Sequence, residues 1–293
     1  MTTISEALLE GRQLLGASVT LDAELLLCHA LGQNRTYLRT WPENILDGSA
    51  LARYRNDIVQ RQSGVPIAHL LGHQAFWTLD LEVSPLTLIP RQDTELLVEL
   101  ALAVDLPSDA RVLDLGTGTG AVALSLASER VNWRVTASDY SSEIVALAER
   151  NAQHNAIFNT QFICSDWYVS LPDEHYHLIV SNPPYIAPND PHLSKGDLRY
   201  ESQTALVAAD EGMSDIKHIV EQGRRYLKSA AWLMLEHGYD QARQVRACLT
   251  SKGYINVASH QDLGGNDRVT LGQWCGDEFL EDVVSFESGR GKV

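Results

Sequence analysis

The sequence has few cysteines, and none of them is paired with another along the chain. The four cysteines lie far apart and form no Cys-x-x-Cys motif: Cys28, Cys164, Cys248 and Cys275. Neither a disulfide framework nor a cysteine zinc site is therefore expected. This use of cysteine is typical of a cytoplasmic protein.

Long apolar runs are also missing. No run approaches the roughly 18 residues that a membrane-spanning helix needs, and the polar start has no basic region ahead of an apolar one. We therefore expect neither export nor membrane insertion. The 20 glycines and 10 prolines among 293 residues are too few for a collagen-like or low-complexity chain.

Basic residues are scarce. The chain has 23 Lys and Arg against 38 Asp and Glu, which gives a formal net charge of −15. This charge repels phosphate backbones over long range, so a nucleic-acid substrate is not expected. What the chain does have is an ordinary hydrophobic content of 44%, and its length suits one large or two unequal domains.

Residues 1–73 are predicted to form a small helical domain. Apolar side chains recur there at helical spacing: Ile4, Leu8, Leu9 and Leu15, and then Leu21, Leu25, Leu26 and Ala30. A third helix is predicted over 49–62, after which Gly64 and Pro66 end the helical pattern. His69 and His73 could share a metal ion only on a continuous helix. Gly72 favours a break and no third ligand is suggested, so no metal site is expected.

Residues 74–90 are predicted to form a β-hairpin linker. Phe76, Leu79, Leu81 and Val83 alternate with polar residues in a way that suggests two short strands with a turn near 79–80.

Residues 91–275 are predicted to form an α/β domain. Asp93 is expected to cap a helix through Val104. Strand-like and helical runs then alternate, which predicts about seven strands in a mostly parallel sheet covered by helices. The strands are expected at 111–115, 134–138, 160–164, 178–181, 231–235, 254–258 and 268–271, and the helices at 120–129, 142–155, 215–228 and 240–251. The acidic residues 276–293 are predicted to be a disordered tail.

The segment 112–121 contains three alternating glycines between a strand and a helix. Glycines in such a turn let a ligand approach the backbone closely. The same letters also satisfy the dinucleotide pattern, so the turn alone leaves a nicotinamide dinucleotide open as the ligand. Asp139 ends the next strand, where a carboxylate can accept both ribose hydroxyls. Asp166 and Trp167 follow the third strand, where they could flank an adenine ring.

The segment Asn-Pro-Pro-Tyr at 182–185 ends the fourth strand and should face the same crevice. Two prolines remove two backbone donors, and the Asn182 side-chain oxygen and Pro183 carbonyl remain as acceptors. Two acceptors beside the Tyr185 ring suit a planar NH2 group, whose two hydrogens need two partners. The alternative is a rigid loop that binds nothing.

Together, the segments at 114–120 and 182–185 resemble those of S-adenosylmethionine-dependent methyltransferases that modify planar amines and amides. The segments Leu-Ile-Pro-Arg-Gln-Asp-Thr-Glu at 88–95 and Gly-Gly-Asn-Asp-Arg-Val at 264–269, with the helical N-terminal domain, narrow the resemblance. From about Ile4 to Trp274 the chain is similar to the release factor glutamine methyltransferase (PrmC/HemK) family. It departs from the family pattern at Gln92, where a proline is usual.

The resemblance implies a Rossmann-like class I methyltransferase fold with a small N-terminal helical domain that recognises the substrate. The implied cofactor is S-adenosylmethionine, with these binding residues: Asp114, Gly116, Thr117, Gly118, Thr119, Gly120, Asp139, Asp166, Trp167 and Asn182. The implied catalytic residues are Asn182, Pro183 and Tyr185, and substrate binding would also involve Pro184, Arg91 and Glu95. An alternative for Arg91 and Glu95 is an ion pair at the helix start.

The implied reaction is methylation of the glutamine amide nitrogen in the Gly-Gly-Gln motif of bacterial peptide chain release factors, during translation termination. We expect a cytoplasmic monomer with no membrane partner. Two other functions stay open at this point. One is methylation of the adenine amine in nucleic acid, which the net charge disfavours. The other is a cofactor-binding protein that recognises a partner without catalysis.

Overall fold

The computed structural model describes residues 1–16 and 20–276. The chain divides into two compact units. The first comprises Met1–Gln74 together with Val83–Pro85 and Pro191–Tyr200, and the second comprises Ala75–Glu82, Leu86–Asp190 and the chain from Glu201 onward. Apart from Gly276, the predicted acidic tail lies outside the described residues.

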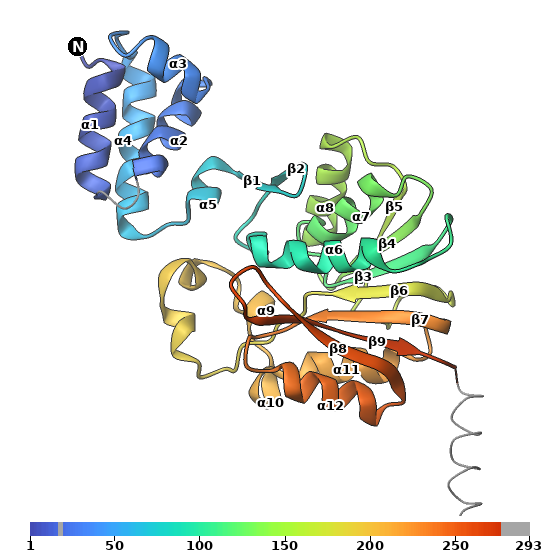
Figure 1. The fold of residues 1–293 in the computed structure, drawn as a ribbon. Coiled ribbons are helices and arrows are strands. Elements are labelled where there is room, and N and C mark those ends of the chain that lie inside the picture. The colour runs from blue at the N-terminus through green and yellow to red at the C-terminus, as the bar shows by residue number, and fades with distance from the viewer. Residues whose placement is uncertain (17–19, 277–293) are drawn as a thin grey trace, which may run out of the picture. The chain divides into compact units, whose positions relative to one another are not determined.

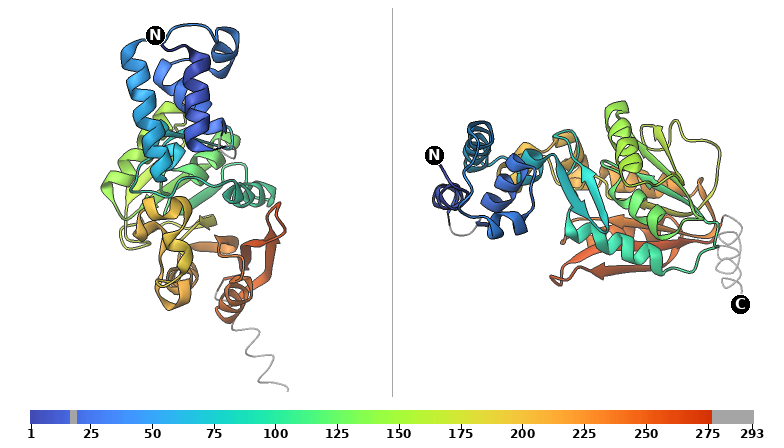
Figure 2. Two further views of the ribbon diagram at one scale, coloured as in Figure 1. Left: turned by 90° about the vertical axis from the view of Figure 1, so that its left-hand side faces the viewer. Right: turned by 90° about the horizontal axis from the view of Figure 1, so that it is seen from above.

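The first unit is helical. Its helices are α1 (Ile4–Leu15), α2 (Thr20–Leu31), α3 (Arg35–Thr40), α4 (Gly48–Ser63) and α5 (Ile67–Leu71). Helices α1, α2 and α4 lie side by side, as Figure 2 shows in blue. Their apolar faces enclose a small core that includes Leu26, Leu27 and Ile58. In no described part of the chain is a helix long and apolar enough to cross a membrane.

Local capping explains where these helices begin and end. The Thr3 hydroxyl accepts a hydrogen bond from the Glu6 backbone N–H, and the Glu6 carboxylate accepts one from the Thr3 N–H, so both free donors at the start of α1 are satisfied. The Asp47 carboxylate caps α4 by accepting from the Ser49 and Ala50 N–H groups, and Gly64 follows α4 in the left-handed region at φ 102°. The predicted third helix is confirmed to within one residue at each end. Helices α3 and α5 were not predicted because they are too short to show a helical period.

The second unit contains a seven-stranded sheet in the order β5-β4-β3-β6-β7-β9-β8. The strands are β3 (Arg111–Leu115), β4 (Arg134–Asp139), β5 (Thr160–Cys164), β6 (Tyr176–Ser181), β7 (Leu227–Glu236), β8 (Tyr254–Gln261) and β9 (Asp267–Trp274). Strand β9 runs antiparallel to both of its neighbours, and the other pairings are parallel. The predicted mostly parallel sheet is confirmed.

Helices cover both faces of this sheet (Figure 1). Helices α6 (Glu95–Ala103), α7 (Ala121–Glu129) and α8 (Ser142–His154) pack on one face, while α11 (Ser214–Gly223) and α12 (Ala242–Ser251) pack on the other. Successive side chains of a strand point to opposite faces, so in β3 the Val112 side chain joins one core cluster and Leu113 joins the other. The strands are therefore buried on both sides, and their carboxyl ends remain open to a ligand.

Two local predictions were wrong. The hairpin of β1 (His73–Phe76) and β2 (Leu79–Glu82) turns at Trp77 and Thr78, not at 79–80, because Trp77 adopts φ 56° and reverses the chain there. Asp93 does not cap the helix. It lies inside a 3-10 turn, η2 (Gln92–Thr94), and its carboxylate pairs with Arg268.

The segment between β6 and α11 folds into four short helices that were not predicted. They are η3 (Pro191–Ser194), η4 (Gly196–Tyr200), α9 (Gln203–Leu206) and α10 (Ala209–Gly212). Elements of four or five residues carry no periodic signal that a sequence pattern could reveal.

Asn151 on α8 is a buried polar residue that joins α8 to the end of β2 and to the glycine turn. It is 1% exposed, it accepts from the Glu82 N–H at 2.7 Å, and it donates to the carbonyls of Glu82 at 3.0 Å and Thr119 at 2.9 Å. Asn151→Ala removes these three buried hydrogen bonds, so we expect the free energy of unfolding to fall by about 1–3 kcal/mol. Urea denaturation measures this. The exposed Gln153→Ala on the same helix is the control, and an equal loss in both variants would contradict the assignment.

Candidate functional site

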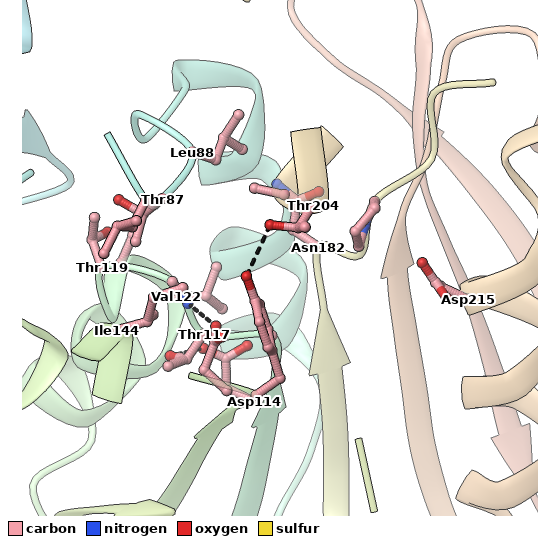
Figure 3. Close-up of a pocket in the computed structure, with 18 of the residues that line it drawn as sticks. Thr87, Leu88, Asp114, Thr117, Thr119, Val122, Ile144, Asn182, Thr204 and Asp215 are labelled. Carbon is pink, nitrogen blue, oxygen red and sulfur yellow. Dashed lines mark hydrogen bonds between the residues drawn. The ribbon is translucent and has the colours of Figure 1, made fainter. Parts of the chain in front are cut away.

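A cavity of about 330 Å³ opens at the carboxyl ends of β3, β4 and β6. Ten of the residues singled out in the sequence line it: Asp114, Gly116, Thr117, Gly118, Thr119, Asp139, Asp166, Trp167, Asn182 and Pro184. Figure 3 shows Thr119 and Ile144 on one side of this cavity and Asp215 on the other. Parallel strands therefore bring together residues as far apart in the sequence as Asp114 and Pro184.

The glycine turn forms one wall of the cavity. Gly116 and Gly118 lie in the left-handed region, at φ 69° and 55°, where a side chain would be strained. The turn is held in place because the Thr117 N–H donates to the Ser138 carbonyl at 2.9 Å and the Gly118 N–H donates to Asp139 Oδ2 at 2.9 Å. Gly116 and Gly118 therefore line the cavity without a side chain, and the binding role predicted for this turn stays a prediction.

Asp114 anchors this turn from below. Its Oδ2 accepts from the Thr117 hydroxyl at 2.7 Å and from the Ala123 N–H at 3.2 Å. The residue is 2% exposed, and this burial raises the pKa of the Asp114 carboxyl group to about 7. The two hydrogen bonds act in the opposite direction and favour the ionised form.

The cavity is acidic. Four carboxyl groups line it, those of Asp114, Asp139, Asp166 and Asp215, and none of its described lining residues is Lys, Arg or His. Burial raises the pKa of Asp139 and of Asp215, and the nearby Asp166 carboxylate raises the pKa of Asp215 further. Such a wall favours a ligand that carries positive charge and disfavours one that carries phosphates.

Asn182 lies at the cavity with its side-chain amide fixed at one end. Its Nδ2 donates to the Thr94 hydroxyl oxygen at 3.2 Å, so Oδ1 is the end left to accept a hydrogen bond from a ligand. Pro184 also lines the cavity, but Pro183 and Tyr185 are not among its lining residues. The Tyr185 hydroxyl points to Glu236 Oε1 at 3.4 Å, and burial raises the pKa of Tyr185.

Three other predicted site residues do not line the cavity. Gly120 stands behind the turn as the N-cap of α7. Arg91 forms an ion pair with the buried Glu201, and Glu95 accepts from the Trp77 N–H at 2.9 Å. The proposed ion pair between Arg91 and Glu95 is therefore not formed, and their role at a substrate entrance stays a prediction.

The two histidines considered as metal ligands, His69 and His73, do not lie on one helix. Helix α5 ends at Gly72, which adopts φ 76°, and His73 begins β1. Across residues 1–16 and 20–276, no group of three His, Cys, Asp or Glu side chains is placed to hold a metal ion.

Several residues that line the cavity were not predicted from the sequence to belong to the site. Thr94 lies inside the segment at 88–95 that carried the resemblance, so its position could have been considered. Asp215 could be recognised only as an acidic residue at the start of the helix predicted at 215–228, which does not by itself indicate a binding site. Nothing in the sequence pointed to Thr204. Helix α9, which was not predicted, places its hydroxyl 2.9 Å from the Tyr140 hydroxyl, and both residues line the cavity.

The fold and the glycine turn define a class I methyltransferase. Residues 92–196 match the methyltransferase small domain family, and residues 6–72 match the PrmC N-terminal domain family. The crystal structure of a methyltransferase from Pyrococcus furiosus has the same fold, with a TM-score of 0.53 and 19% identity over 75% of this chain and 98% of that chain.

Curated relatives show the family more narrowly. The release factor glutamine methyltransferase of Pseudomonas aeruginosa is 53% identical over 94% of this chain and 100% of its own length. That of Escherichia coli is 50% identical over 86% of this chain and 91% of its own length. The chain belongs to the release factor glutamine methyltransferase family.

The buried carboxyl group of Asp114 should make stability depend on pH. Its pKa rises from 3.8 to about 7 on folding, so the folded state holds a proton that the unfolded state releases. The stability from this group is present below about pH 4 and is lost as the pH rises through about 7. In Asp114→Asn we expect the fall in unfolding free energy between about pH 5 and pH 8 to be smaller by about 1–3 kcal/mol. Urea denaturation at a series of pH values tests this, and an identical slope in both proteins would refute it.

Proposed function

We propose that this chain methylates the side-chain amide nitrogen of the glutamine in the Gly-Gly-Gln motif of bacterial peptide chain release factors, with S-adenosylmethionine as the methyl donor. The family gives the class of reaction. The observation that carries the finer proposal is the Asn182 amide, whose NH2 is held by Thr94 so that its oxygen is left for a ligand at the cavity.

The residues of the cavity fit this cofactor. S-adenosylmethionine carries a sulfonium and an ammonium group, and four carboxyl groups line the cavity. Its ribose hydroxyls suit Asp139, and its adenine suits the Asp166 and Trp167 pair. A nicotinamide dinucleotide carries two phosphates, for which the described lining residues offer no basic side chain. When bound, the cofactor supplies an electrophilic methyl group.

The chain's own residues have to orient a weak nucleophile. A carboxamide nitrogen shares its lone pair with the carbonyl, so it attacks only when it is well placed. Asn182 Oδ1 and the Pro183 carbonyl would each accept one amide hydrogen and turn the lone pair toward the methyl group. No strong base is then needed before transfer, because the proton leaves after the new N–C bond has formed.

The substrate of this proposal is a folded protein and not a free amino acid. We propose that residues 1–73 recognise the release factor, and that Arg91 and Glu95 lie near the entrance for its Gly-Gly-Gln loop. Release factors act on the ribosome, so the reaction would take place in the cytoplasm. We further propose that the enzyme acts as a monomer.

Methyl transfer to a purified release factor tests the proposal directly. With labelled S-adenosylmethionine, we expect label on the wild-type release factor and none on a release factor in which the motif glutamine is replaced by alanine. DNA serves as a third acceptor and should stay unlabelled. Label on the alanine substrate would exclude the glutamine assignment, and label on DNA alone would favour an adenine methyltransferase.

The division of labour at the site gives a second test. Asn182→Ala removes an acceptor for the substrate, so kcat should fall by about 100-fold or more while the Kd for the cofactor changes little. Asp139→Ala should instead weaken cofactor binding by about 10- to 100-fold, because a hydrogen-bonded carboxylate is lost. Calorimetric titration and steady-state kinetics separate the two effects. Equal loss of cofactor binding in both variants would contradict this assignment.

A further inference from the structure

The backbone of the loop at 182–185 offers few groups by which the loop can be held in place. Pro183 and Pro184 have no N–H, so neither residue can donate a backbone hydrogen bond to the surrounding structure. The proposed reaction also needs the Pro183 carbonyl for the substrate amide. The structure anchors the backbone just after the two prolines, at the Tyr185 carbonyl.

The Gln241 side chain provides this anchor. Gln241 is the N-cap residue of α12 and is 7% exposed. Its Nε2 donates to the Tyr185 carbonyl at 3.0 Å and to the Glu211 carbonyl at 3.3 Å. Its Oε1 accepts from the Gly238 N–H at 2.8 Å. Because the Gly238 N–H can only donate, the amide has one satisfactory orientation, with its NH2 toward Tyr185.

The segment 210–212 packs behind the same carbonyl in a strained conformation. Asp210 and Glu211 adopt φ 56° and 55°, which is costly for residues with a side chain. Gly212 follows at φ 84°, and a Cβ atom there would collide with the Tyr185 carbonyl oxygen. Such strain persists only where the surrounding contacts enforce it. The segment therefore leaves the Tyr185 carbonyl no space to move away from Gln241.

The residues on both sides of the loop are anchored as well. The Ile186 N–H donates to the Leu206 carbonyl at 2.9 Å, and the Ile186 carbonyl accepts from the Ala208 N–H at 3.0 Å. At the other end, the Ser181 hydroxyl donates to the Leu115 carbonyl at 2.7 Å. The loop is therefore tied at its two ends, and Gln241 acts on the backbone between them.

A fixed Tyr185 carbonyl restricts the direction of the Pro183 carbonyl. The ring of Pro184 fixes one of the backbone torsions that lie between these two carbonyl groups. The other torsions have little freedom, because the chain is anchored again at Ile186. A rotation of the Tyr185 carbonyl away from Gln241 is therefore passed on to the Pro183 carbonyl.

We propose that Gln241 is a positioning residue for methyl transfer: by donating to the Tyr185 carbonyl, it fixes the direction in which the Pro183 carbonyl meets the substrate amide. This inference rests on the proposed function and deepens it. Gln241 is not among the residues that line the cavity, so in this assignment it acts only through the loop at 182–185.

Gln241→Met tests the connection. The substitution keeps the length of the side chain and removes its hydrogen bonds, so kcat at saturating cofactor and release factor should fall by about 10- to 100-fold, as expected for a misplaced acceptor. The Kd for the cofactor should stay within about threefold. Gln244→Met, at an exposed position of α12, is the matched control and should leave kcat unchanged. Wild-type kcat in Gln241→Met, or an equal loss of cofactor affinity, would overturn the proposal.

Gln241→Glu gives a readout that a merely structural role would not move. The ionised carboxylate cannot donate to the Tyr185 carbonyl, whereas the protonated form can donate to it and still accept from the Gly238 N–H. Burial against carbonyl oxygens should raise the pKa of the new carboxyl group. The ratio of its kcat to that of the wild type should therefore rise by about three- to tenfold between about pH 8 and pH 6. The ratio for Gln241→Met should stay constant, and a rise of equal size in both variants would contradict the proposal.

Crystal structures of the wild type and of Gln241→Met with the cofactor product bound give a readout that does not depend on activity. In the variant, the Pro183 carbonyl should point in a different direction, while the Asn182 amide should still donate to Thr94. An unchanged Pro183 carbonyl would overturn the proposal even if kcat falls. Failure of the wild type to label release factors would instead remove the proposed function, and the control of the loop by Gln241 would then be judged by these structures alone.

Discussion

The buried carboxylate of Asp114 is the constraint on which the site depends. It stands at the end of β3 and accepts hydrogen bonds from the Thr117 hydroxyl and the Ala123 N–H, so one side chain joins the strand, the glycine turn and the first turn of α7. The chain must bend sharply between these partners, and Gly116 and Gly118 allow it to do so at positive φ. This bend turns the backbone of Gly116 and Gly118 to one side of the cavity, so space for a ligand is left at the carboxyl end of the sheet.

Charge then selects what the cavity can hold. A wall with four carboxyl groups, one of them with a pKa raised to about 7, is unfavourable when empty and favourable around a cation. Gathering buried carboxyl groups at one site therefore lowers the stability of the folded protein, as is usual at binding sites. The described lining residues offer no basic side chain to the two phosphates of a nicotinamide dinucleotide, although the glycine turn has the sequence pattern of a dinucleotide-binding turn.

The segments that carried the family resemblance are joined in space by polar contacts. Arg268, near the start of β9, pairs with Asp93 of η2, and the next residue, Thr94, accepts from Asn182 of the loop at 182–185. Three parts of the sequence that lie far apart thus support one amide. A proline in place of Gln92 would restrict the backbone next to this junction, whereas the contacts themselves come from Asp93 and Thr94.

The sequence alone determined the alternation of strands and helices, the glycine turn, and Asp114, Asp139 and Asn182 as residues of one crevice. These follow from local rules, namely periodicity, glycine conformation and the meeting of parallel strand ends. Only the tertiary structure decided that Tyr185 turns to Glu236 and that Thr94 holds the Asn182 amide. The partner of a polar side chain is chosen by donors and acceptors from distant segments once water is excluded, and no local pattern encodes that choice.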